Sequence, residues 1–174
     1  RVNANMGGGN DTLNYTSTSE AVTVDLAAGT ASGFNSITSI EHVTGGSGAD
    51  TLTGNGLANN LNGGSGVDLI NGGGGNDNIN GGLGNDTLNG EAGNDTFTLT
   101  WGQNPDTIDG GADTDTYNIL GSGGGDNFSV VYDVSLTAAT KIMGEVGSGE
   151  VEITGMSEVG VEAGSGDVRV RDVP

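Results

Sequence analysis

Single apolar residues recur every nine positions through the middle of this chain. Six consecutive nonamers between Gly45 and Thr98 each have an apolar residue at position eight: Leu52, Leu61, Ile70, Ile79, Leu88 and Phe97. Positions seven and nine are mostly Thr or Asn. Because alternate side chains of a strand point to opposite faces, this pattern predicts three-residue strands that bury one side chain each. A nine-residue period fits neither an amphipathic helix nor an ordinary hairpin.

Longer apolar alternations follow the nonamers. Phe97, Leu99 and Trp101 alternate with threonines, and Phe128–Leu136 continues the same two-residue period. Pairs of apolar residues also alternate near the C-terminus: Val151 and Ile153, Val159 and Val161, Val168 and Val170. These runs predict longer strands that rely more on apolar burial.

The other positions of each nonamer are rich in glycine and acid. Position one is Gly in all six copies, position four is Gly in five, and position six is Asp in five; Leu57 and Asn59 are the exceptions. A related copy, MGGGNDTLN, stands at Met6–Asn14. Glycine lets turn carbonyls converge, and Asp adds a hard oxygen, so the turns offer the ligands that Ca²⁺ prefers. Since one buried side chain offsets little of the cost of ordering nine residues, we expect metal to replace much of the core.

The pattern G-G-x-G-x-D-x-U-x resembles the RTX nonapeptide repeat of secreted bacterial proteins. The resemblance is strict over 45–98 and looser over 101–129. It implies an all-β fold, a right-handed parallel β-roll or β-solenoid in which two nonamers form one coil, with longer-stranded coils at both ends. It also implies three segments: N-terminal coils with one isolated repeat (1–44), a calcium-binding β-roll (45–129), and longer-stranded C-terminal coils without metal ligands (130–174).

The resemblance further implies that stacked turns hold several Ca²⁺ ions between them, roughly five to seven, through carboxylates and glycine carbonyls. Turns that begin at Gly45, Gly63 and Gly81 should share one edge, and those at Gly54, Gly72 and Gly90 the other. The candidate metal ligands are Asp11, Gly46, Gly48, Asp50, Asn59, Gly64, Gly66, Asp68, Gly73, Gly75, Asp77, Gly82, Gly84, Asp86, Gly93, Asp95, Asp106, Gly111, Asp113, Asp115 and Asp126.

Three qualifications shape this assignment. The aspartates have an alternative role as Asx caps of the turns, without metal. Asn59 keeps an oxygen but lacks a charge, so we expect the weakest site between the turns at Gly54 and Gly72. Val151 and Val168 stand where ligands belong, so we expect metal in the middle of the chain and metal-free turns at its C-terminal end.

The amino-acid composition limits the kinds of partner that this chain can bind. Among 174 residues there are 36 glycines and no cysteine, and 23 acidic residues against four basic ones give a net charge of −19. Such a polyanion is a poor ligand for nucleic acid or anionic membranes, because binding to them needs clustered Lys and Arg, so its natural partners are cations. The resemblance to RTX repeats implies that these cations are calcium ions. No apolar run is long enough to span a membrane, and without cysteine neither disulfides nor thiolate metal sites form.

We therefore expect a calcium-binding module of a secreted or cell-surface bacterial protein that folds and rigidifies on extracellular Ca²⁺, joined to flanking domains of a longer chain. The alternatives are a structural or adhesive segment of a surface layer or large adhesin, or an accessory module of a secreted enzyme or toxin. Catalysis by this segment is disfavoured, because it has none of the common hydrolase or nucleotide motifs and His42 is its only histidine. The outward Thr and Asn rows are either a solvated strand face or a surface for glycan or ice.

Overall fold

The computed structural model describes residues 2–100, 106–120, 141–146, 150–154, 159–163 and 167–171. Within these ranges the chain consists of strands and turns, with no helix, and so none that could cross a membrane. The strands are β1 (Val2–Asn5), β2 (Thr12–Asn14), β3 (Thr23–Asp25), β4 (Thr30–Ala31), β5 (Phe34–Thr38), β6 (His42–Thr44), β7 (Thr51–Thr53), β8 (Asn60–Ser65), β9 (Leu69–Gly74), β10 (Asn78–Leu83), β11 (Thr87–Ala92), β12 (Thr96–Thr100), β13 (Thr107–Asp109), β14 (Thr116–Leu120), β15 (Lys141–Val146), β16 (Glu150–Thr154), β17 (Val159–Ala163) and β18 (Asp167–Arg171).

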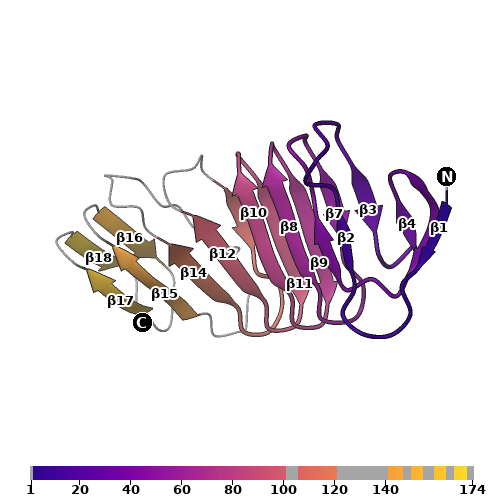
Figure 1. The fold of residues 1–174 in the computed structure, drawn as a ribbon. Helices are drawn as coiled ribbons and strands as arrows, with labels where there is room; N and C mark the ends of the chain where they lie inside the picture. The colour runs from indigo at the N-terminus through magenta and orange to yellow at the C-terminus, as the bar shows by residue number, and fades with distance from the viewer. Residues whose placement is uncertain are drawn as a thin grey trace.

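Two sheets, parallel except for the pair β3–β4, wind together into a β-solenoid (Figure 1). One has the order β17-β15-β14-β12-β10-β8-β6-β2, and the other the order β13-β11-β9-β7-β3-β4. Within the nonamer array each strand pairs with the strand eighteen residues away, as in Asn60↔Asn78 and Leu69↔Thr87. Two nonamers therefore form one coil, and the expected all-β solenoid is confirmed.

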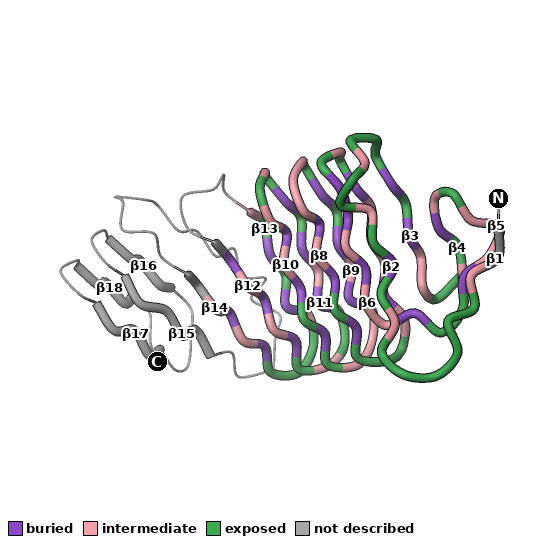
Figure 2. Tube along the Cα trace, viewed as in Figure 1, coloured by how far each residue is buried: buried purple, intermediate pink, exposed green. Residues whose placement is uncertain are grey.

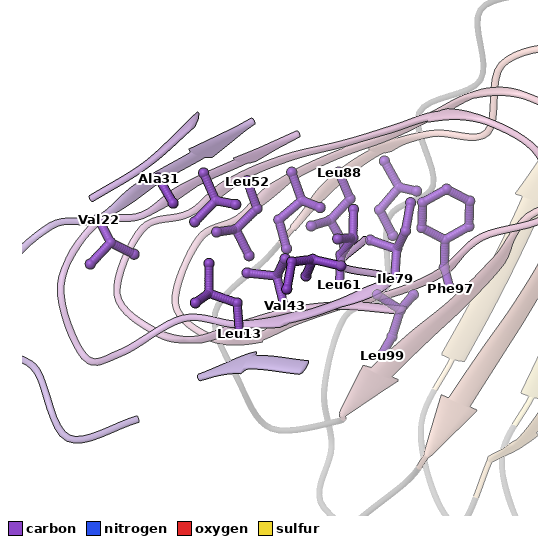
Figure 3. Packing of buried hydrophobic residues seen from close by; sticks show 14 of the residues in the cluster. Leu13, Val22, Ala31, Val43, Leu52, Leu61, Ile79, Leu88, Phe97 and Leu99 are labelled. Carbon is purple, nitrogen blue, oxygen red and sulfur yellow. The ribbon is translucent and has the colours of Figure 1, made fainter. Parts of the chain in front are cut away.

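The core is a narrow stack of apolar side chains between the two sheets. Position-eight residues fill it, and Figure 3 shows Val43, Leu61, Ile79 and Phe97 following one another along the solenoid. Buried positions recur at the same level in successive coils (Figure 2). The ring of Phe97 stacks on that of Tyr117, with centroids 5.2 Å apart. The strand pattern of the sequence thus identifies the core residues correctly.

Strand lengths differ from those expected. Each of β8, β9, β10 and β11 has six residues rather than three, because pairing continues into the glycines of the next nonamer, as in Gly82↔Gly64. At the N-terminal end β2, β3 and β6 have three residues each, while β1 has four and β5 has five. Glycine backbones stack as closely as strands do, which lengthens the ladder in the middle of the chain.

The N-terminal end of the core is closed by non-repeating structure. Strand β4 pairs with β3 in antiparallel fashion, and β1 pairs with β5 outside the two long sheets. Val22, Ile37 and Ile40 are at most 5% exposed and extend the apolar stack. This end buries more apolar residues beyond the repeat positions than any later coil among the described side chains.

Two further expectations concern the C-terminal half. The register slips by two residues after Thr98, as expected, since Thr87 pairs with Thr107 and Thr96 with Thr116. In the last coils Val151 pairs with Val168 and Ile153 with Val170. Trp101, Asp126 and the run Phe128–Leu136 lie outside the described residues.

Truncating one core residue tests how much each buried side chain contributes to the stability of the fold. Ile79 is 1% exposed within the apolar stack, so Ile79→Ala should lower the free energy of unfolding by about 2–5 kcal/mol. Urea unfolding in calcium-saturated buffer measures the change. Leu83→Ala is the control, because Leu83 is 48% exposed and its loss should cost less than about 0.5 kcal/mol.

Candidate metal centre

The position-six side chains stack in a column along each edge of the solenoid. In the first column the N–H of Asp50 donates to Asp68 Oδ1 at 2.7 Å. The N–H of Asp68 donates in turn to Asp86 Oδ1 at 2.9 Å, and that of Asp86 to Asp106 Oδ1 at 2.9 Å. One oxygen of each carboxylate therefore caps the turn of the preceding coil.

The second column repeats this arrangement on the opposite edge. The N–H of Asn59 donates to Asp77 Oδ1 at 2.7 Å, and that of Asp77 to Asp95 Oδ1 at 2.8 Å. The N–H of Asp95 donates to Asp115 Oδ1 at 2.9 Å and so continues the column. The two edges predicted from the eighteen-residue spacing are both present.

The second carboxylate oxygen of these aspartates has no partner. Oδ2 of Asp68, Asp77, Asp86 and Asp95 is buried without a hydrogen bond, in residues at most 2% exposed. A buried carboxylate oxygen without a donor or cation is costly. The Asx-cap alternative thus explains Oδ1 but leaves Oδ2 unexplained, and an unpaired buried anion is a place for a cation.

The first glycine of each nonamer makes room for that oxygen. A Cβ added at Gly63, Gly81 or Gly90 would overlap Oδ2 of the aspartate five residues later. Any larger residue would displace the carboxylate from the turn. This contact gives a physical reason for the strict glycine at position one.

Glycines at positions two and four face carbonyl oxygens of the preceding coil. A Cβ at Gly82 would overlap the carbonyl oxygen of Gly64, and one at Gly84 would overlap that of Gly66. These glycines have φ of 96° and 144°, in the range that favours glycine. Carboxylates and backbone carbonyls thus gather at the same turns, which is an oxygen donor set suited to Ca²⁺.

Backbone oxygens would supply much of the coordination. Nowhere among the described residues do three Asp, Glu or His side chains converge closely enough to hold a metal by themselves. Ca²⁺ takes six or more oxygens and accepts carbonyls readily, so a turn of this composition fits it. The residues that would hold the ions are the aspartates of the two columns and the facing turn carbonyls.

Burial also changes the acidity of the columns. Loss of solvent raises the pKa of Asp68 and Asp77 to about 6, although the hydrogen bonds from the backbone of Asp50 and Asn59 oppose the rise. Neighbouring carboxylates raise it further. The pKa values of Asp106 and Asp115 are likewise raised to about 6 by burial, and those of Asp86 and Asp95 are raised for the same main reason.

Other predicted site residues are placed differently. Asp11 lies at the start of the second column, because it precedes strand β2, which pairs with β6, and β6 pairs with β8. The N–H of Asp11 donates to Glu41 Oε2 at 2.9 Å. A Cβ at Gly7, Gly8 or Gly9 would meet no atom within 4 Å, so no turn is stacked on this side of the isolated repeat. Asp113 is exposed, with φ of 75°, in a place where glycine is usual. Asp126 lies outside the described residues.

Glu41 is a column member that the repeat pattern did not reveal. Glu41 directly precedes the strand His42–Thr44, just as Asp50 directly precedes the strand Thr51–Thr53. Its carboxylate accepts the N–H of Asp11, just as the carboxylate of Asp68 accepts the N–H of Asp50. The six residues before it lack the glycine signature. An acid directly before an x-U-x strand is the signal that would have identified it.

Comparison with protein families identifies the repeated segment. Four overlapping stretches, 39–70, 53–88, 62–97 and 72–104, match the model of the RTX calcium-binding nonapeptide repeat. The fold defines a parallel β-solenoid, and residues 39–104 of it match RTX calcium-binding nonapeptide repeats. This family is a structural calcium-binding module rather than a catalytic one. A comparison with curated proteins gave no matching relative.

Close stacking of the turns makes a sharp substitution test. Gly84→Ala places a methyl group on the carbonyl of Gly66 and imposes an unfavourable φ, so it should raise the calcium concentration needed for folding several-fold or prevent folding. Gly56→Ala is the matched control, because its Cβ would meet no atom within 4 Å. Calcium titration of both variants by circular dichroism gives the comparison, and equal midpoints would contradict the stacking geometry.

The raised pKa values predict how pH acts on the calcium-free protein. Folded Asp68, Asp77, Asp106 and Asp115 bind protons more tightly than an unfolded Asp with pKa of about 3.9, so their protonation stabilises the fold. This contribution is complete below about pH 4 and is lost as pH rises through about 6.

In chelator, the melting temperature should therefore be higher at pH 5 than at pH 7.5. Saturating calcium should raise it more at pH 7.5, because the ion needs ionised carboxylates. A calcium-free melting temperature that rises from pH 5 to pH 7.5 would show that these carboxylates are not the groups that limit stability.

Proposed function

We propose that this chain is a calcium-folded β-roll module of a secreted or cell-surface bacterial protein. The observation that supports the proposal most directly is the pair of carboxylate columns, in which Oδ2 of Asp68, Asp77, Asp86 and Asp95 is buried without a partner. Bound Ca²⁺ would supply positive charge and a flexible oxygen coordination sphere at these turns. The match of residues 39–104 to calcium-binding repeats agrees with this role.

Calcium would decide whether the array is folded. The apolar stack provides one position-eight residue per nonamer, and at neutral pH the ionised carboxylates within one column repel one another. Extracellular calcium modules bind at about 10⁻⁴–10⁻³ M, far above the calcium of the cytosol. The module would therefore remain open inside the producing cell and fold after export.

Rigidity follows from the same binding. Each coil contacts only its neighbours, so ions that join successive turns would turn a loose chain into a stiff rod. Such a rod suits a spacer in an adhesin or surface layer, and equally an accessory module beside a secreted enzyme or toxin. The sequence that flanks this segment in the parent protein distinguishes between these contexts.

Far-ultraviolet circular dichroism with metal titration tests the proposal. The chain should gain β-structure as Ca²⁺ reaches millimolar concentration, while Mg²⁺ at the same concentration should give little change. Mg²⁺ requires compact octahedral geometry and keeps its water, whereas these turns offer a wide set of carbonyls. A chain that is fully folded in excess chelator at neutral pH would refute calcium-dependent folding.

A further inference from the structure

Within the nonamer array the turns occur in two forms, and the change falls between Asn62 and Gly63. We infer that the coil 45–62 holds its own turns together without metal, and that the calcium array begins at Gly63. This inference rests on the proposed function and refines it, because it assigns which of the predicted ligand positions need an ion.

Backbone conformation separates the two forms. From Gly63 onward, the residues at positions two and four of the first turns have φ in the left-handed region: Gly64 (100°), Gly66 (129°), Gly73 (98°) and Gly75 (100°). Their counterparts in the preceding coil, Gly46, Gly48, Asn55 and Leu57, do not. The repeat letters at Gly46 and Gly64 are the same, so the difference lies in the folded turn.

This difference decides whether the position-six side chain is satisfied. In the first coil the N–H of Gly46 donates to Asp50 Oδ2 at 2.7 Å, while Oδ1 accepts the N–H of Val22 at 2.8 Å. Both oxygens of Asp50 are paired. In the turn at Gly64 the equivalent bond is absent, and Asp68 Oδ2 is buried without a partner.

Asn59 completes the same coil without a charge. Its Oδ1 accepts the N–H of Asn55 at 2.8 Å, and its Nδ2 donates to the carbonyl oxygen of Glu41 at 3.2 Å. An amide oxygen paired in this way already has a donor within its own turn. The expected weak site at Asn59 therefore becomes a turn closed by hydrogen bonds alone.

The preceding chain occupies the remaining space beside this coil. The N–H of Ser47 donates to the carbonyl oxygen of Thr18 at 2.9 Å, and a Cβ added at Gly48 would come within 2.6 Å of the Ala21 nitrogen. Contacts with residues 18–21 thus cover the turn at Gly45. Asp11, in the isolated repeat outside this coil, keeps one unpaired oxygen, and Gly7 and Gly9 have φ of 91° and 130°. A Cβ added at Gly7, Gly8 or Gly9 would meet no atom within 4 Å, so the preceding side of that turn is open.

A coil that folds without metal would affect how the calcium-dependent coils fold. A solenoid coil is stable only against a neighbour, so the first calcium-bound coil needs a surface on which to stack. Strand β7 and residues 60–62 of β8 belong to the coil 45–62, and they pair with β9 and β10 and supply that surface. Residues 4–62 would act as a preformed template from which calcium-dependent folding proceeds toward the C-terminus.

Hydrogen exchange of the full chain, read by mass spectrometry in chelator and across a calcium titration, tests this arrangement. In chelator the strands of residues 12–62 should be protected and those of residues 69–120 should exchange at least tenfold faster. Millimolar calcium should protect the second segment and change the first little. Loss of protection in both segments on chelation, with a common calcium midpoint, would overturn the inference while leaving the proposed function intact.

Other outcomes are equally decisive. If residues 69–120 are protected in chelator, both the inference and calcium-dependent folding fail. If residues 12–62 remain unprotected even with calcium, the inference of a preformed template fails.

A pair of charge-neutralising variants at equivalent positions provides a second measurement. Asp77→Asn should reduce the number of ions bound per chain, counted by native mass spectrometry. Asp50→Asn should bind the same number as the unmodified chain, yet melt at a lower temperature with or without calcium, because it loses a hydrogen bond from Gly46. An equal loss of ions in both variants would show that Asp50 is a ligand and overturn the inference.

Discussion

The structure depends on one interaction, the buried carboxylate that joins each turn to the turn of the preceding coil. Oδ1 of Asp68 or Asp77 accepts a backbone N–H from that coil, which fixes the spacing of the stack. Oδ2 of the same group is buried without a partner, in space that a side chain at the first glycine of the nonamer would fill. Glycine, acid and an eighteen-residue repeat are thus consequences of a single geometry, since changing any of them separates the carboxylate from its neighbours.

This geometry explains how a chain of such composition folds at all. From Leu52 to Leu88 the apolar stack has one buried hydrophobic side chain per nonamer, and each ordered residue costs conformational entropy. A net charge of −19 opposes compaction as well. Cations at the turns would offset both the entropy cost and the charge repulsion. Each ion would neutralise carboxylates and link backbone segments that have little apolar surface to bury.

Much of this architecture follows from the sequence, and the exceptions have physical causes. Strand positions, the core residues and the pairing of turns eighteen apart are dictated by the nonamer, because each copy repeats the same local choices. Six-residue strands were missed because stacked glycines pair as regular strand does. Glu41 and the antiparallel pair β3–β4 were missed because they lie where the period is broken, so that only tertiary contact places them.

The form of each turn is also beyond what the repeat pattern contains. Asp50 and Asp68 follow the same glycine signature, but loop residues 18–21 lie against the first turn and another nonamer lies against the second. Contact with that loop accompanies a backbone in which Gly46 donates to Asp50, and a satisfied carboxylate no longer calls for a cation. On the inference that the coil 45–62 needs no metal, counting aspartates in register would overestimate bound calcium, because the neighbouring coil as well as the nonamer itself would decide whether a turn needs an ion.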